Sequence, residues 1–201
     1  MPLRALARVN LAAIERNVSR LRSQLSGADL CAVVKADGYG HGAVPAARAA
    51  ITGGASWLAV ATAPEAAELR AASVEQPILV MGAVSAEELP IALDAEAHLV
   101  AWSEAFVGEV ARAAETEVPI HVKLDTGMGR LGTRERDQAL RVAQRVSAEP
   151  RLRLAGAMTH FATADDDREF VAAQLKAFAP FVAEMRRRQS GIVVHAANSA
   201  A

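Results

Sequence analysis

A lysine followed by a glycine-rich segment is the most chemically suggestive part of the sequence. Residues 32–34 form a short apolar run, typical of a buried parallel strand, and Lys35 follows it directly. At the end of a buried strand an amine can lie in a pocket, where desolvation lowers its pKa and makes it a nucleophile or base. The alternative is a lysine that simply reaches water. Three nearby glycines, with Tyr39 and His41 among them, favour a ligand-binding loop.

A second lysine lies in an expected strand that leads into another glycine-rich turn. Lys123 alternates with Val122 and Leu124, so in a barrel its side chain points inward. An unpaired ammonium is too costly to bury, so Lys123 needs a carboxylate partner or must lose its charge. The alternative is an ordinary connection whose charged residues face water.

Two further segments place polar residues after expected strands. His160 follows an apolar run, and on residue type alone it is more often a hydrogen-bonded core histidine than a catalytic group. Residues 195–201 form a polar turn, in which Asn198 or Ser199 could instead be the N-cap of a helix.

These segments belong to a regular alternation of strands and helices within 201 residues, about half of them apolar, which is enough for one domain. Arg4–Asn10 is a candidate short strand, and Asn10 is a plausible cap for a helix over Leu11–Leu25. Strands are then expected near Asp29–Val34, Trp57–Ala61, Ile78–Met81, His98–Ala101, Ile120–Leu124, Leu154–Met158 and Ile192–His195. Helices are expected over Val44–Ile51, Pro64–Ala72, Ala86–Leu93, Ser103–Ala114, Arg134–Ser147 and Asp166–Arg188.

This alternation admits an α/β doubly wound open sheet or a TIM-type barrel. Polar and glycine-rich segments follow four different strands, which favours a barrel, because a barrel gathers the ends of its strands at one mouth. Without the short N-terminal segment the count is seven strands, whereas a closed barrel needs eight.

Composition and charge exclude several classes of function. The formal net charge is −1 with acids and bases interspersed, so we expect no nucleic-acid or anionic-membrane partner. No apolar run is long enough for a membrane span and no signal peptide is evident, which predicts a cytoplasmic protein. The single cysteine, Cys31, is expected to be a small core residue, and no metal site is expected.

Residues 34–42, Val-Lys-Ala-Asp-Gly-Tyr-Gly-His-Gly, resemble the pyridoxal 5'-phosphate (PLP) signature of bacterial alanine racemases. This resemblance implies a TIM-type (β/α)8 barrel of the PLP fold type III class, here incomplete with about seven βα units in a single domain over residues 1–201. It also implies PLP as the cofactor and the interconversion of L-alanine and D-alanine, which supplies D-alanine for peptidoglycan.

The resemblance further assigns roles to individual residues. Lys35 would carry the cofactor and act as a base. Lys123 would be carbamylated and, as an anion, would orient Arg130 against the substrate carboxylate and the cofactor's phenolic oxygen, with Asp125 supporting that arrangement. His160 would lie against the pyridine ring. The cofactor-binding residues would also include Tyr39 and Ser199, on the phosphate, and Asn198.

The family takes its second catalytic base, a tyrosine, from a C-terminal β-domain of the other subunit of a homodimer. Tyr39 is the only tyrosine in this sequence. We therefore expect the N-terminal portion of an alanine racemase, lacking the β-domain, which binds PLP weakly and is inactive alone. Two alternatives are a single-barrel PLP-binding protein of cofactor homeostasis and a racemase or decarboxylase of the same fold acting on another amino acid.

Overall fold

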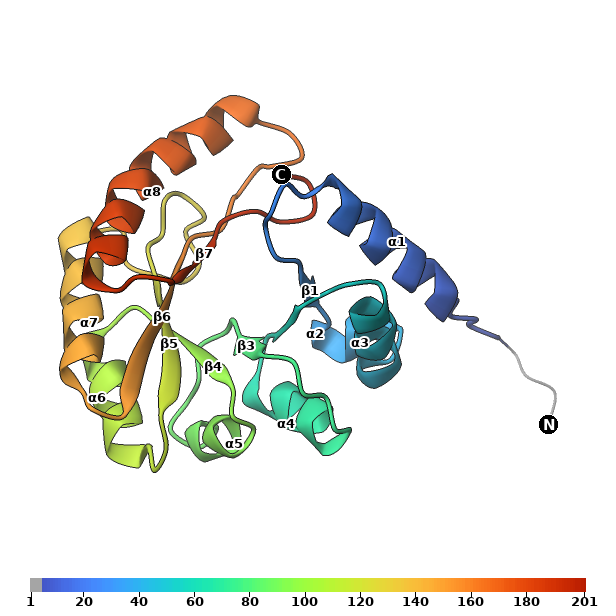
Figure 1. Ribbon diagram of the computed structural model, residues 1–201, viewed down its shortest axis with the longest axis horizontal. Coiled ribbons are helices and arrows are strands. Elements are labelled where there is room, and N and C mark those ends of the chain that lie inside the picture. The colour runs from blue at the N-terminus through green and yellow to red at the C-terminus, as the bar shows by residue number, and fades with distance from the viewer. Residues whose placement is uncertain (1–4) are drawn as a thin grey trace.

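The fold is built on one curled parallel sheet. The computed structural model describes residues 5–201. Seven strands lie in sequence order, every neighbouring pair is parallel, and the sheet curves into an arc with helices outside it (Figure 1). The strands are β1 (Cys31–Val33), β2 (Trp57–Val60), β3 (Ile78–Val80), β4 (His98–Ala101), β5 (Val118–Lys123), β6 (Leu152–Met158) and β7 (Val193–His195).

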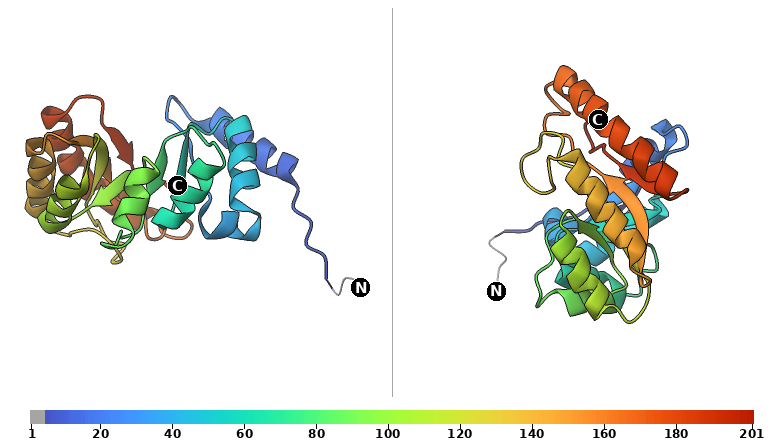
Figure 2. Two further views of the ribbon diagram at one scale, coloured as in Figure 1. Left: turned by 90° about the horizontal axis from the view of Figure 1, so that it is seen from below. Right: turned by 90° about the vertical axis from the view of Figure 1, so that its left-hand side faces the viewer.

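Helices precede and connect these strands. Two further views of the arc show the helices along its outer side and residues 5–10 extending away from the body (Figure 2). The helices are α1 (Leu11–Gln24), α2 (Lys35–Gly40), α3 (Ala43–Thr52), α4 (Ala63–Ala71), α5 (Leu89–Asp94), α6 (Glu104–Ala113), α7 (Arg136–Ala148) and α8 (Arg168–Arg188).

Most of the predicted pattern of elements is confirmed, although a short helix, α2, forms where a loop was expected. All seven predicted strands after the first helix are present, with ends displaced by at most two residues. The Asn10 side chain accepts a hydrogen bond of 3.1 Å from the Ala13 N–H and caps α1, as expected. The helix predicted from Ala86 begins only at Leu89.

The strand predicted over Arg4–Asn10 is wrong. Arg4 lies outside the described residues, and residues 5–10 have no regular structure and are exposed. An extended segment needs a neighbouring strand to pair its backbone groups, and none of the described strands pairs with residues 5–10.

The sheet is an incomplete TIM-type barrel. Within residues 5–201, β1 pairs only with β2 and β7 only with β6, so the two edge strands do not pair with each other. A closed barrel of this type has eight strands. The prediction of a barrel with about seven βα units is therefore confirmed.

Apolar side chains alternate between the two faces of the sheet. Those on the outer face pack against the helices and form the main core; Leu58, Ile78 and Leu99 are examples. A smaller cluster lies on the inner face and contains Ala59, Leu79, Val100 and Met158. None of the helices in the described part of the chain is long and apolar enough to cross a membrane.

Candidate active site

Lys35 begins an unusual turn at the end of β1. Residues 36–39 all have positive φ, between 51° and 60°, so the chain makes one left-handed turn. Only one of these four residues is glycine, and each of the others costs about 1–2 kcal/mol in this conformation. The turn places the Tyr39 ring beside Lys35, with Nζ 5.9 Å from the ring centroid. A strained backbone that presents two polar side chains is typical of a functional site.

A carboxylate from a neighbouring helix supports this left-handed turn. Glu65 of α4 accepts a hydrogen bond of 2.6 Å from the Ala36 N–H, and its other oxygen accepts from the Ala61 and Thr62 N–H groups. Burial acts to raise the pKa of Glu65, but these backbone hydrogen bonds outweigh it and lower the pKa. The carboxylate therefore stays charged and joins the turn to the start of α4. Nothing in the local sequence around Glu65 indicated this role.

Lys123 lies on the inner face at the end of β5, as predicted. Ile120 and Val122 pack outward against the helices, and Lys123 is only 3 % exposed. Among the described residues no ion pair involves Lys123. Burial lowers the pKa of its amine and the charge of Arg130 lowers it further, while Asp125 partly offsets them. Lys123 thus has no carboxylate partner in an ion pair within the described chain, and its surroundings disfavour the charged form of the amine.

Arg130 lies in the glycine-rich loop after β5 and is exposed. Asp125 does not support it, contrary to expectation, because its carboxylate accepts hydrogen bonds from the Gly127 and Gly129 N–H groups and pairs with Arg134 at 3.5 Å. Burial acts to raise the pKa of Asp125, but these backbone bonds, with Arg134, lower it. Asp125 thus fixes the loop rather than the Arg130 side chain.

His160 is the residue through which the predicted site comes together. It is half-buried at the end of β6, where burial lowers its pKa. The positive charges of Lys123, Arg130 and Lys35 lower that pKa further. Side chains from the ends of three strands, separated by more than 100 residues of sequence, therefore share one electrostatic environment.

The turn after β7 is joined to the loop that carries His160. The Asn198 amide donates to the carbonyl of Phe161 at 3.5 Å, and its oxygen accepts from the Ala200 N–H. Within the described chain Asn198 closes a turn over residues 198–201. Ser199 is exposed in this turn, and no hydrogen bond joins it to Tyr39.

Gln174 of α8 is a supporting residue that the sequence did not indicate. It is 1 % exposed, and its amide donates to the His160 carbonyl at 3.1 Å and to Thr126 Oγ1 at 3.2 Å. Its oxygen accepts from the Ala162 N–H at 3.0 Å. Thr126 Oγ1 is also 2.7 Å from Thr159 Oγ1. One buried amide thus joins the loops after β5 and β6.

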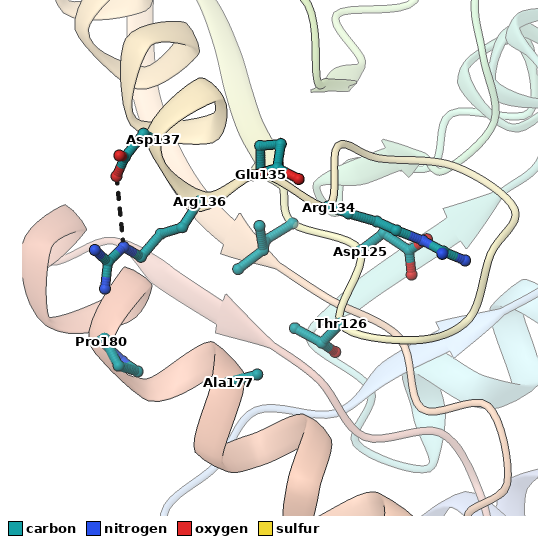
Figure 3. A pocket seen from close by; sticks show the side chains of 9 residues that line it. Asp125, Thr126, Arg134, Glu135, Arg136, Asp137, Ala177 and Pro180 are labelled. Carbon is teal, nitrogen blue, oxygen red and sulfur yellow. Dashed lines mark ion pairs between the residues drawn. The ribbon is translucent and has the colours of Figure 1, made fainter.

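A hollow lies on the outer side of the loop after β5. Its volume is about 460 Å³, and its walls come from that loop, the start of α7 and α8 (Figure 3). Arg136 and Asp137 form an ion pair of 3.7 Å at its rim. Of the residues to which the resemblance assigns a role, only Asp125 lines it. Nothing in this hollow links it to the chemistry of Lys35 and His160.

The groups around His160 are suited to an anionic ligand. Lys35, Lys123 and Arg130 are basic, and none of them is in an ion pair within the described chain. Such a set of donors fits phosphate and carboxylate groups. Burial raises the pKa of the Cys31 thiol to about 12, which fits the prediction that it is a core residue and not a nucleophile.

Comparison with known proteins decides the family. A family model described as the N-terminal domain of alanine racemase matches residues 9–201. The chain belongs to this family. Alanine racemase 1 of Bacillus subtilis is 39% identical over 97% of this chain and 50% of its own length. The alanine racemase of Thermobifida fusca is 41% identical over 98% of this chain and 54% of its own length.

Solved alanine racemase structures have the same fold. The enzyme from Bacillus anthracis, with bound L-Ala-P, superposes with a TM-score of 0.87 at 34% identity over 95% of this chain and 51% of that one. The Streptomyces coelicolor enzyme has a TM-score of 0.87 at 38% identity over 94% and 53%. A histidine racemase from Leuconostoc mesenteroides is also similar, with a TM-score of 0.80 at 26% identity over 94% and 52%. The chain spans about half the length of the curated relatives it matches.

Proposed function

We propose that this chain binds PLP through Lys35 and supplies the cofactor-binding part of an alanine racemase. The observation that carries the proposal is the placement of Lys35, Lys123 and His160 at the C-terminal ends of β1, β5 and β6. In a TIM-type barrel this end of the strands is where active sites are built. The product, D-alanine, would supply peptidoglycan synthesis.

The residues present fit the cofactor. Tyr39 and the turn with Asn198 and Ser199 offer a phenol, an amide and a hydroxyl for a phosphate. His160 can lie against a ring. Lys35 can join an aldehyde covalently through its amine. When bound, PLP would withdraw electrons from the amino acid's Cα and so make its proton removable.

In this proposal Lys35 acts twice. It would hold the cofactor through its amine and, as a free amine, would take the Cα proton on one face and return it. Arg130 holds the substrate carboxylate with its planar guanidinium, which orients Cα toward Lys35. His160, which burial and its cationic neighbours keep neutral, can accept or share a hydrogen bond there.

Carbamylation of Lys123 would organise Arg130. The neutral amine of Lys123 attacks CO₂, forms an N–C bond and loses a proton. The side chain, which is a cation when protonated, thereby becomes an anion. The depressed pKa of Lys123 raises the fraction of neutral amine available for this reaction. Repulsion between Lys123 and Arg130 would then become attraction.

Racemisation needs a second base on the opposite face of Cα. Tyr39, the only tyrosine of the sequence, lies beside Lys35 in the left-handed turn. We infer that the second base is not among the described residues and that, as the family suggests, it comes from the β-domain of the other subunit of a homodimer. The 201 residues are proposed as one PLP-binding domain.

A second candidate function is racemisation of another amino acid. The similarity to a histidine racemase structure favours keeping it, because the same fold at 26% identity occurs in a protein named for a larger substrate. The two functions would share Lys35, Arg130 and His160 and differ in the space left for the side chain.

Cα proton exchange tests both functions. The PLP-loaded chain would be incubated in D₂O with alanine or histidine, and loss of the Cα proton followed by NMR. We expect exchange with alanine but no formation of D-alanine, because Lys35 serves only one face of Cα; exchange with histidine should be slower, and Lys35→Ala should show none with either amino acid. Exchange that is faster with histidine would favour the second candidate, and absence of exchange with both would contradict the proposal.

A further inference from the structure

Three histidines form a continuous hydrogen-bonded chain on the inner face of the sheet. Nδ1 of His98 lies 2.9 Å from Nε2 of His121, and Nδ1 of His121 lies 2.7 Å from Nε2 of His195. His121 is fully buried, and the two outer rings are half-buried. None of the three belongs to the proposed PLP site.

The three histidines occupy offset positions in the register of neighbouring strands. His98 is the first residue of β4, and His121 of β5 pairs with Val100, two residues further along that strand. His121 pairs with Gly156 of β6, whereas His195 of β7 pairs with Met158, two residues further again. Adjacent ring centroids lie 5.2 and 4.7 Å apart, and Trp57, at the start of β2, contacts both outer rings. The chain therefore joins the first residue of β4 to the last residue of β7 over a short distance.

The His195 end of the histidine chain is in register with Lys123 of the proposed site. Met158, the partner of His195, also pairs with Lys123 across β5 and β6. Within residues 5–201 no hydrogen bond involves Nε2 of His98 at one end of the histidine chain, and none involves Nδ1 of His195 at the other. In the described chain Thr163 Oγ1 is the only buried polar side-chain atom without a partner, so both terminal nitrogens retain contact with solvent.

The surroundings favour three neutral rings. Burial lowers the pKa of His98 and His195 to about 4 and that of His121 well below its ordinary value. The other charges that act on the chain are positive: Arg153 of β6 on His98 and His121, and Arg70 of α4 on His98. A neutral imidazole has one donor and one acceptor, so each ring can donate to one neighbour and accept from the other.

Two arrangements of protons satisfy this geometry equally well. In one, all three rings carry hydrogen on Nδ1, and the bonds run from His98 toward His195. In the other, all three carry it on Nε2, and the bonds run from His195 toward His98. Because each ring fixes the tautomer of the next, the chain changes between the two arrangements only as a unit.

We propose that His98, His121 and His195 form a proton-transfer chain between solvent at the start of β4 and the mouth of the barrel at the end of β7. A proton bound at Nε2 of His98 displaces the Nδ1 proton to His121. His121 passes its own Nδ1 proton to His195, which releases its Nδ1 proton at the mouth. All three rings end neutral on Nε2, and the reverse passage restores the first arrangement.

Packing contacts hold the ring of His121 in its position. A Cβ atom on Gly156 would lie 2.1 Å from Nδ1 of His121, so this position of β6 has no room for a side chain while the ring is in place. Trp57 of β2 packs edge-on against all three rings, with centroid distances of 4.7, 5.8 and 6.3 Å. The rings are thus held in line by contacts that make no hydrogen bonds to them.

Ring-nitrogen NMR of the whole chain without cofactor tests this proposal. The use of a proton at the mouth rests on the proposed function, whereas the chain of rings is tested independently of PLP. At neutral pH in protein labelled with ¹⁵N-histidine, we expect ¹⁵N–¹⁵N couplings across both hydrogen bonds. We also expect His195 nitrogen shifts that are averaged between the two tautomers.

Variants at the far end of the chain then separate proton transfer from packing. His98→Asn keeps a hydrogen-bonding group beside His121 but cannot pass a proton on, so His195 should change to a single tautomer. His98→Leu should shift both His195 nitrogens as well, and Trp57→Phe, which removes no hydrogen bond, should not. A single His195 tautomer in the unaltered chain, or an equal effect of Trp57→Phe, would overturn the proposal.

Discussion

At the scale of single residues, the proposed carbamylation depends on how burial and neighbouring charges set the protonation state of Lys123. The residue is almost fully buried, makes no ion pair among residues 5–201 and is repelled by Arg130. An ammonium in this position is unfavourable, so a larger fraction of the amine is neutral than in an exposed lysine. This is the condition under which CO₂ can add to it.

The carbamate can be detected directly. With ¹³C-bicarbonate at about pH 8, we expect a carbamate carbon signal in the NMR spectrum of the chain. The signal should vanish in Lys123→Met and persist in Lys176→Arg, which alters an exposed lysine of α8. A signal that is unaffected by Lys123→Met would place the adduct elsewhere.

Single residues also show where sequence reasoning succeeds and where it does not. The positions of Lys35, Lys123 and His160 were predictable because each lies at the end of an apolar strand within a distinctive local segment. Gln174 was not, because its bond to Thr126 joins residues 48 positions apart. The histidine chain likewise joins residues 23 and 74 positions apart, and only the register of the strands brings them into line.

At the scale of elements, the left-handed turn after β1 and the start of α4 depend on one another. Strain in residues 36–39 has to be offset by contacts, and Glu65 provides the hydrogen bond to the Ala36 N–H. The sequence predicted the strand end and the glycine-rich loop. It could not predict left-handed conformations at Ala36, Asp37 and Tyr39, because these residue types disfavour them.

Replacing Glu65 tests this dependence. Glu65→Gln removes a charged acceptor of three backbone N–H groups, so we expect PLP affinity to fall by about 10-fold, consistent with about 1.5 kcal/mol for a charge-assisted bond. Fluorescence titration with PLP measures the affinity. Glu68→Gln on the exposed face of α4 should change it little, and equal effects of the two substitutions would contradict a specific role for Glu65.

The loops after β5 and β6 are joined by a second such contact. Gln174→Leu would leave the Ala162 N–H, the His160 carbonyl and Thr126 Oγ1 without their partner, which should cost about 2–3 kcal/mol of unfolding free energy. Urea unfolding measures this loss. Gln189→Leu, at the exposed end of α8, is the matched control and should cost less than about 0.5 kcal/mol.

At the scale of the whole molecule, the inner face of the sheet is polar at its centre. Three neutral histidines occupy positions that apolar residues could fill, and their pKa values lie below the ordinary value of 6.5. The unfolded chain therefore binds protons at a higher pH than the folded chain does. Stability is fully present above about pH 6.5 and is lost as the pH falls toward 4.

Unfolding experiments as a function of pH test this prediction. Each neutral histidine contributes a slope of up to about 1.4 kcal/mol per pH unit between these limits. We expect the unfolding free energy to fall between pH 6.5 and 5, and the slope to be smaller in His98→Leu. Equal stability at pH 7 and pH 5 would show that these rings are not held neutral.

The arrangement of the whole sheet brings Lys35 and His160 to the same mouth, and the central claim is that Lys35 carries the cofactor there. The sequence contains three lysines, Lys35, Lys123 and Lys176, so covalent attachment has three clear outcomes. Borohydride reduction of the PLP-loaded chain, followed by peptide mass mapping, would locate the attachment. We predict a pyridoxyl group on Lys35 alone; a label on Lys176 or Lys123 with Lys35 unmodified would contradict the account.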